Sequence, residues 1–469
     1  MLGYIVLLGT IAAIVTIVRK NHREAFVTVY LVSLLCLPGW ARAALPMGHP
    51  NFHEAAMIPI ALVFFFTGMK GYRFSPMDVC VLLLPTIMAV SEYNAMGWAD
   101  ARNLIFDMIF AGICPYFLAK SAVFPGGLRD RFLRNFVLCV CFVIATCIYE
   151  SRFGFNLYRK VFDPFFPGQG EGWVTTFRYG LARAAGAYGH SILAGVIFMF
   201  ALRLQCWLSA SGRWGQSKIF GAVPKGRFLT GWSFLGLALS LVRGPQIGCL
   251  IAWGVSLIAR GRNPKFRAQI AVMAVLLVGV PTAISAYRYA SVGRENAKDS
   301  NQETAAYRKE LLDKYTDIAL EHAWLGWGLT KWPKLASMPS IDNYFLLLAL
   351  MHGVVASGLL AGTIVIFSIR LYRDGMRAAP MRPGGSSLSF CLFGLFLGHA
   401  FAIATVYMGE QVFPVFMIIC GLAEGHLLNG GDAALQRELS GRGTGALSTP
   451  NAAGESAPSG AFRFRRAVS

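Results

Sequence analysis

The sequence predicts an all-α protein that crosses a membrane many times, and two observations support this fold class. Of the 469 residues, 55% are hydrophobic and only 14% are charged, whereas a soluble globular protein carries about 25% charged residues. Apolar runs of roughly 17 to 25 residues, long enough to cross the hydrocarbon layer as helices, recur along the chain. Backbone groups in lipid must be paired internally, so we expect these runs to be helical.

We expect 12 to 14 transmembrane helices within one membrane domain, residues 1–428. Thirteen candidate spans lie near residues 2–18, 25–41, 55–69, 76–95, 101–119, 133–149, 187–207, 228–242, 245–259, 268–286, 343–369, 387–407 and 411–428. One large polar loop, residues 287–342, is inserted between two spans. Residues 429–469 are rich in Gly, Ala, Ser and Pro, so we predict a disordered cytoplasmic tail.

The net charge of +19 would suggest nucleic acid as a partner of a soluble protein, but here its distribution indicates topology. Lys and Arg gather in alternate short loops, for example at Arg129, Arg131 and Arg134, and such loops face the cytoplasm. The amino terminus is then outside, and the long loops 150–186 and 287–342 are extracytoplasmic. We therefore expect a multi-pass membrane protein, with the bilayer and not nucleic acid as its surroundings.

Metal or nucleotide chemistry has little support in the sequence. All ten cysteines fall within predicted spans, and no cluster of cysteines and histidines has the spacing of a metal site. The chain has no GxxxxGK[ST] loop for nucleotide phosphates. We expect no metal and no cofactor, so the energy for any reaction comes from the substrate or from a gradient.

The large loop is the densest cluster of charged and aromatic residues in the chain. From Glu303 to Glu321, apolar residues recur with helical spacing, which predicts an amphipathic helix lying on the membrane or on the helix bundle. Trp324 and Trp327 follow in a WLGWG sequence, where the glycines permit a turn. The tryptophans can equally be plain anchors at the membrane interface.

Three extracytoplasmic arginines are candidates for binding an anion: Arg183 in RAAGAYGH, Arg243 in SLVRGPQ and Arg308 in the amphipathic helix. Arg243 lies in a turn of only a few residues between two spans, where a charge is costly and usually functional. A guanidinium offers a fixed fork of donors that matches phosphate oxygens. The alternative is that these side chains only reach toward lipid headgroups.

Asp342 is the candidate general base, because the loop re-enters the membrane at the sequence SIDNY. A carboxylate within reach of an attacking hydroxyl can take its proton, and partial burial there can raise its pKa. Helix capping by Ser340, Asp342 or Asn343 is the alternative. Asn343, Tyr344 and His190, which follows Arg183, are possible supporting residues. Glu410 and Gln411 are expected to expose a short outer turn to water.

The order of these elements resembles the O-antigen polymerase and ligase superfamily of bacterial envelope glycosyltransferases. The similar segments are RAAGAYGHSILAG, LSLVRGPQIG, YRKELLDKYTDIALEHAWLGWG and SIDNYFLLLALMHG, within roughly residues 180–365. The resemblance implies metal-independent, inverting glycosyl transfer from undecaprenyl pyrophosphate on the periplasmic face of the bacterial inner membrane. Arg183, Arg243 and Arg308 then match arginines that hold the pyrophosphate, with Arg243 and Asp342 as the catalytic pair.

The resemblance favours a polymerase of exopolysaccharide or O-antigen, since ligases that act on lipid A core usually carry His where this chain has Asp342. The ligase stays open as an alternative. A flippase for lipid-linked sugar or a solute transporter is a different class, and a noncatalytic scaffold is a third. Related halves with broken helices would favour a transporter, whereas the polar residues here are concentrated in one outer loop. The family also implies a flippase and a chain-length regulator as partners.

Overall fold

The computed structural model is almost wholly helical and describes residues 2–45, 48–67, 69, 72–124, 127–170, 175–219, 221–258, 263–338, 340–379 and 386–445. Within these ranges, six helices are long and apolar enough to cross a membrane. The number is up to seven if Val412–Leu428 and Gly431–Glu438, bent by 72°, form one span. Shorter apolar helices lie beside them. The predicted fold class, an all-α multi-pass membrane protein, is thereby confirmed.

The elements of the described residues up to 162 are helices: η1 (Leu2–Leu7), α1 (Leu8–Arg19), α2 (His22–Ala25), η2 (Phe26–Tyr30), α3 (Leu31–Cys36), α4 (Phe52–Phe66), α5 (Pro76–Met96), α6 (Trp98–Asp107), η3 (Met108–Ile113), α7 (Cys114–Leu118), η4 (Ala119–Val123), α8 (Arg129–Phe153) and α9 (Leu157–Phe162). Several of them are continuous: α6, η3, α7 and η4 make one rod of 26 residues, Trp98–Val123.

The chain after α9 adds two short hairpins, β1 (Phe177–Arg178) with β2 (Leu181–Ala182), and β3 (Lys218–Ile219) with β4 (Val223–Pro224). Its helices are α10 (Ser191–Ala210), α11 (Lys225–Leu239), α12 (Arg243–Ile258), α13 (Pro264–Ala274), η5 (Val275–Gly279), α14 (Val280–Ala290), α15 (Ser300–Glu321), α16 (Tyr344–Ala378), α17 (Leu388–Ile403), α18 (Val412–Leu428) and α19 (Gly431–Gly445). Each of the thirteen predicted spans overlaps a helix; the number of membrane crossings stays a prediction.

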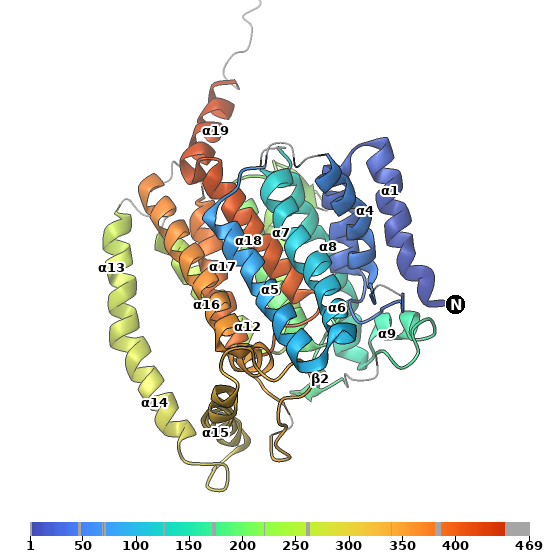
Figure 1. Cartoon of the computed structure of the whole chain (residues 1–469). Coiled ribbons are helices and arrows are strands. Elements are labelled where there is room, and N and C mark those ends of the chain that lie inside the picture. The colour runs from blue at the N-terminus through green and yellow to red at the C-terminus, as the bar shows by residue number, and fades with distance from the viewer. Residues whose placement is uncertain are drawn as a thin grey trace, which may run out of the picture.

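The helices form a bundle with two distinct ends (Figure 1). One end, the outer face, carries the amino terminus, α9, the β1–β2 hairpin and α15, while α19 extends from the opposite end, the inner face. The sequence predicts that the outer face is extracytoplasmic, and both long loops do lie on it.

Buried helices at the centre hold the outer face in place. Within the most apolar 18-residue stretch of α10, 89% of the residues are buried inside the protein. Helix α12 packs on α17 through glycines: a Cβ on Gly248 would lie 2.5 Å from the carbonyl oxygen of Gly398. Small residues let two helices approach closely in a membrane, and this contact fixes α12, the helix that begins at Arg243.

Helix α16 is broken at Gly353, whose φ of 84° is not helical. The break frees carbonyl groups, which must find other donors in an apolar environment. The outer loop supplies them: Trp327 N donates to Leu350 O and Gly328 N to Met351 O, both at 2.8 Å. The WLGWG segment is therefore built into the broken helix, and the predicted span 343–369 corresponds to a candidate membrane-spanning helix, Tyr344–Ala378, that has a break at Gly353.

The first turns of α16 pack under α15, which matches the predicted amphipathic helix. The buried face of α15 includes Leu311, Tyr315 and Ala319, and it meets Ile341 and Leu350. Its apolar stripe thus faces the helix bundle, one of the two surfaces that we expected.

The segment that we predicted to be a disordered tail begins with a helix, α19. Asp432 is fully buried and accepts hydrogen bonds from Leu388 N and Ser389 N at the start of α17, and Leu435 is 2% exposed. These contacts hold the start of α19 against the bundle, and the disordered tail as a whole stays a prediction. Residues 446–469 lie outside the described residues.

Candidate functional site

The β1–β2 hairpin places two candidate side chains, Arg178 and Tyr179, on the outer face. Its two-residue turn, Tyr179 and Gly180, has φ of 55° and 74°, as in the type I′ turns that fit hairpin twist. Arg178 donates to the Leu241 carbonyl at 2.6 Å, and the Tyr179 hydroxyl lies 3.4 Å from Arg243 Nη2. The hairpin thereby connects the loop before α10 to the turn before α12.

Arg183 follows this hairpin, in a loop that Glu150 holds. The buried Glu150 carboxylate accepts from Ala185 N at 3.1 Å and Gly186 N at 2.8 Å. The guanidinium of Arg183 donates only to Thr176 Oγ1, at 3.3 Å, among the described residues, and its Nε is buried without a partner. Burial and the positive charge of Arg178 lower the pKa of Arg183, whereas the negative charge of Asp342 raises it. A guanidinium with unused donors can accept an anionic ligand.

Arg243 is the first residue of α12 and is exposed on the outer face. Its guanidinium donates to the Asn301 side-chain oxygen at 3.1 Å and to Tyr179, so both partners are neutral. The preceding Leu241 has a φ of 51°, a conformation that is rare for residues other than glycine. Such strain is characteristic of functional sites.

Arg308 lies on α15 and is exposed, and within the described ranges it has no hydrogen bond or ion pair. It follows Asn301 by seven residues, which puts both on nearly the same face of the helix, about 10 Å apart along its axis. Since Asn301 contacts Arg243, Arg308 is on the side of α15 that faces this arginine.

Asp342 and Asn343 have separate roles at the start of α16. Asn343 is the cap: its Oδ1 accepts from Leu346 N at 3.1 Å. Asp342 therefore does not cap the helix; its described partner is Ser340 Oγ at 3.4 Å, and it is close enough to Arg183 for their charges to interact. Tyr344 lies in the main hydrophobic core, so it is not brought into the site.

His190 caps α10, because its Nδ1 accepts from Ile192 N at 3.2 Å. Burial and the charges of Arg183 and Arg159 lower the pKa of His190 to about 4, so the imidazole is neutral at pH 7. A small pocket of about 10 Å³, enough for about one water molecule, is lined by Glu150, Arg159, Arg183 and His190, among others.

Three helices begin on the outer face beside these arginines: α10 at Ser191, α12 at Arg243 and α16 at Tyr344. The amino-terminal end of a helix carries a partial positive charge and free N–H groups, both of which favour anions. Together with the guanidinium groups, these helix ends make the outer face a suitable place for a diphosphate.

Glu410 is a candidate that the sequence analysis missed. We expected Glu410 and Gln411 to be exposed, but Gln411 is buried and donates to Leu37 O and Ala187 O. The Glu410 Oε2 atom is shielded and has no hydrogen-bond partner in the described part of the chain; a Cβ on Gly189 would lie 2.9 Å from it. Burial raises the pKa of Glu410 to about 7, and Arg42 opposes the rise.

Arg178, Arg159 and Tyr179 were also missed. The sequence signal for Arg178 was its position only five residues before Arg183 in a loop already predicted to be extracytoplasmic. For Tyr179 and Glu410, the decisive property is a positive φ, which a non-glycine residue does not reveal in the sequence.

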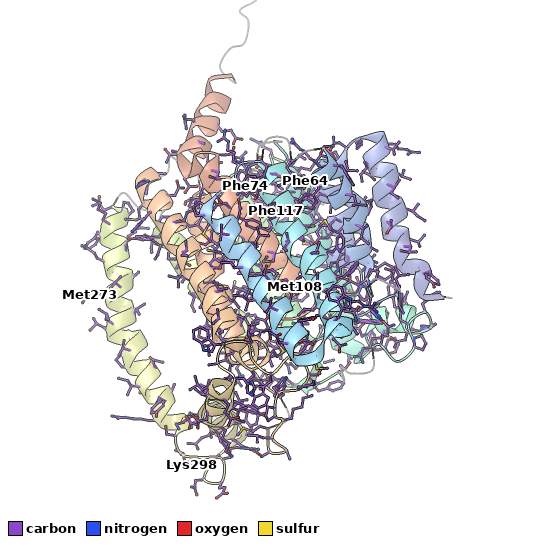
Figure 2. All side chains as sticks on the ribbon, in the orientation of Figure 1. Phe64, Phe74, Met108, Phe117, Met273 and Lys298 are labelled. Atoms are coloured by element: carbon purple, nitrogen blue, oxygen red, sulfur yellow. The ribbon has the colours of Figure 1, made fainter. Side chains whose placement is uncertain are left out.

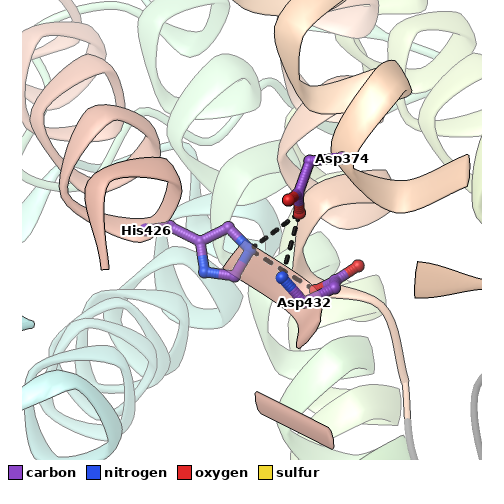
Figure 3. A group of neighbouring side chains, drawn as sticks. All are labelled: Asp374, His426 and Asp432. Atoms are coloured by element: carbon purple, nitrogen blue, oxygen red, sulfur yellow. Dashed lines mark hydrogen bonds and ion pairs between the residues drawn. The ribbon is translucent and has the colours of Figure 1, made fainter. Parts of the chain in front are cut away.

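A second polar cluster lies on the inner face, where His426 stands between Asp374 and Asp432 (Figure 3). The His426 Nε2 atom is 2.9 Å from Ser389 Oγ and 3.4 Å from Asp432 Oδ1, and Asp374 Oδ2 accepts from Asp432 N at 2.9 Å. These contacts join α16, α17, α18 and α19. The spacing of the three side chains would suit a metal ion. In this structure they contact one another and Ser389, and we interpret the cluster as a structural contact that connects the four helices.

Residues 228–361 match the family described as O-antigen ligase. The match confirms the resemblance to the O-antigen polymerase and ligase superfamily. It supports a function of this general type, glycosyl transfer by a membrane enzyme. The matched segment contains Arg243, Arg308 and Asp342, whereas Arg183 and His190 precede it. A comparison with curated proteins found no match.

Proposed function

We propose that the protein is a polysaccharide polymerase that acts on the periplasmic face of the inner membrane. The donor is a glycan on undecaprenyl pyrophosphate, and the acceptor is the non-reducing end of a lipid-linked repeat unit. One observation carries the proposal: Arg178, Arg183, Arg243 and Arg308 belong to one outer surface, and none of them forms an ion pair among the described residues. A large unneutralised positive charge beside three helix amino termini suits a diphosphate.

The reaction is a single displacement. The acceptor hydroxyl oxygen attacks the anomeric carbon of the donor, the bond from that carbon to the pyrophosphate oxygen breaks, and the configuration inverts. Asp342 takes the proton of the hydroxyl, and the electron pair of the broken bond leaves with undecaprenyl pyrophosphate. The arginines stabilise the charge that develops on this leaving group. Preorganised donors of this kind contribute about 3 to 4 kcal/mol each to lowering a barrier.

An assay with purified protein and lipid-linked repeat units tests the proposal, with a ladder of polymer lengths as the readout. Arg243→Ala should abolish the ladder. Arg152→Ala is the matched control, because Arg152 is an exposed arginine near the outer end of α8 and lies outside the proposed site. Normal polymer from a stably inserted Arg243→Ala protein would contradict the mechanism.

Asp342→Asn separates the general base from helix capping, since Asn343 already caps α16. We expect the rate to fall about 100-fold or more with an unchanged melting temperature. If the rate is unaffected, Glu410 is the next carboxylate to examine, because its pKa of about 7 is suitable for a base.

The same assay discriminates the alternatives. A ligase would transfer the glycan to lipid A core and form no ladder from repeat units alone. A flippase would leave single units unchanged in chemistry and move them across a vesicle membrane, and a scaffold would tolerate both Arg243→Ala and Asp342→Asn.

A further inference from the structure

The polar cluster on the inner face has the donor set of a metal site. His426 of α18 lies between Asp374 of α16 and Asp432 of α19 (Figure 3). One ligand atom from each of these side chains lies within 4.8 Å of the other two. The three residues come from three helices, which explains why the spacing of residues in the sequence gave no sign of a metal site.

The distances within the cluster suit an ion such as Zn²⁺. Histidine nitrogen and carboxylate oxygen bind zinc at about 2.0 to 2.2 Å, so two ligands of a tetrahedral ion lie roughly 3.4 Å apart. The His426 Nε2 atom is 3.4 Å from Asp432 Oδ1 and 3.8 Å from Asp374 Oδ2. The Ser389 hydroxyl, 2.9 Å from the same nitrogen, provides a fourth oxygen within reach.

The carboxylates of the cluster lack a cationic side chain. Asp432 is fully buried and Asp374 is partly buried, but among the described residues neither forms an ion pair with a lysine or an arginine. By contrast, the buried Asp78 has Lys120. Two carboxylates beside a neutral imidazole carry two uncompensated negative charges, which are costly to bury. A divalent cation would neutralise both.

The turn between α18 and α19 brings the carboxylates together. Gly430 and Gly431 have φ of 89° and 56°, and the chain bends by 72° between the two helices. A Cβ on Gly431 would overlap Asp374 Oδ1, so glycine is required for this close approach. The Oδ1 atom accepts no hydrogen bond from the described residues, and it is therefore available as a ligand.

We propose that Asp374, His426, Asp432 and Ser389 bind a divalent transition-metal ion of the zinc class, which joins α16, α17, α18 and α19. An imidazole in the donor set favours such an ion over Ca²⁺ or Mg²⁺, which prefer oxygen ligands. The inference goes beyond the proposed function, because the cluster lies at the α19 end of the bundle. The outer loop, with Lys298, lies at the opposite end (Figure 2).

Hydrogen bonds alone are the competing explanation of the cluster. Asp374 Oδ2 accepts from Ser389 Oγ at 2.6 Å and from Asp432 N at 2.9 Å, and Asp432 Oδ1 accepts from Leu388 N at 2.9 Å. These bonds orient the carboxylates, as the outer hydrogen bonds of metal ligands do. They come from neutral groups, so they leave the two negative charges in place.

Zinc binding by the full-length protein in lipid nanodiscs tests the proposal. The protein is treated with EDTA and dialysed, Zn²⁺ is the probe, and bound metal is measured by mass spectrometry after equilibrium dialysis. Asp374→Asn keeps an oxygen for the bonds from Ser389 and Asp432 but removes the charge, and His426→Gln removes the nitrogen. His22→Gln is the matched control, because it removes a histidine outside the cluster.

We expect about one Zn²⁺ per chain in the wild type and in His22→Gln, and at least tenfold weaker binding in Asp374→Asn and His426→Gln. At about 100 times its Kd, Zn²⁺ should raise the melting temperature of the wild type by about 3 °C or more. The melting temperature of Asp374→Asn should not respond to Zn²⁺.

Equal Zn²⁺ binding by the wild type and Asp374→Asn would overturn the proposal, because the ion would then be held elsewhere, for example by the free cysteines. A wild-type protein that binds no Zn²⁺ would overturn it as well. Co²⁺ gives a second measurement on the wild type alone, which does not depend on the folding of a variant. Visible absorption of tetrahedral Co²⁺ without a thiolate charge-transfer band is expected, whereas a thiolate band would refute the site.

Discussion

The inner and outer faces of the molecule carry their charges differently. On the inner face, Lys120 pairs with the buried Asp78 at 2.6 Å, Arg370 with the buried Glu424 at 2.5 Å, and Arg213 with Asp130 and Glu438. On the outer face, Arg178, Arg183 and Arg243 contact only neutral groups among the described residues.

The difference indicates which charges hold the fold and which are available to a ligand. A buried charge without a partner is very costly, so the charges of the inner face are explained by the partners that they have. The outer face also has ion pairs of its own, such as Arg42 with Asp107 at 3.0 Å and, on α15, Lys314 with Glu310 at 2.6 Å. The open arginines lack an internal explanation, and an anionic substrate provides one.

The largest loss of stability is expected from breaking a buried ion pair. Lys120→Ala leaves Asp78 buried without its partner, so the protein should lose about 3 to 5 kcal/mol of stability. Thermal unfolding can be followed with a thiol-reactive dye, because the cysteines are free and mostly buried. The double variant Lys120→Met with Asp78→Leu should recover most of the loss. A Lys120→Ala protein of normal stability would mean that the pair is not structural.

Removing an outer-face arginine that has no ion-pair partner should reduce activity and leave stability unchanged. Arg243→Ala is expected to reduce polymer formation about 100- to 1000-fold while the melting temperature stays within about 2 °C of the wild type. Arg243→Lys should recover only part of the activity, because a lysine cannot offer the bidentate fork. The comparison between the two faces fails if Arg243→Ala unfolds the protein.

A smaller loss of stability is expected from a substitution at the break in α16. Gly353 has a φ of 84°, and a Cβ there would overlap the Trp324 carbonyl. Gly353→Ala should cost about 2 to 3 kcal/mol and loosen the outer loop, which limited proteolysis within residues 287–342 would detect. Gly358→Ala is the control on the same helix, because nothing lies within 4 Å of a Cβ at that position; equal proteolysis of both variants would refute the role of the break.

The smallest effect concerns Glu410, a half-buried acid on the outer face. Its pKa is raised from 4.5 to about 7, so the folded protein holds a proton that the unfolded chain releases between pH 4.5 and 7. Stability from this group is therefore present at low pH and is lost as the pH rises to about 7. Glu410→Gln should gain about 1 to 2 kcal/mol over wild type at pH 8 and nothing at pH 4.5. An equal difference at both pH values would exclude titration of Glu410 as the cause.

The apolar runs and the distribution of basic residues were sufficient to predict the helices, because lipid leaves the backbone no other way to satisfy its polar groups. The helical stripe of α15 was equally readable, since a period of 3.6 residues is a local property. Sequence patterns also selected Arg183, Arg243, Arg308 and Asp342, whose roles stay predictions.

Only the tertiary structure decided which of these groups are open to a ligand. Asn343 rather than Asp342 became the helix cap, Tyr344 entered the core, and the carboxylate of Glu410 came to lie beside Gly189. The sequence also contains no sign that the WLGWG segment completes a helix broken at Gly353, or that Asp432 orders α19. The reason is physical: chain periodicity reports what each segment buries, whereas the partner of a particular charge or carbonyl depends on segments far away in the sequence.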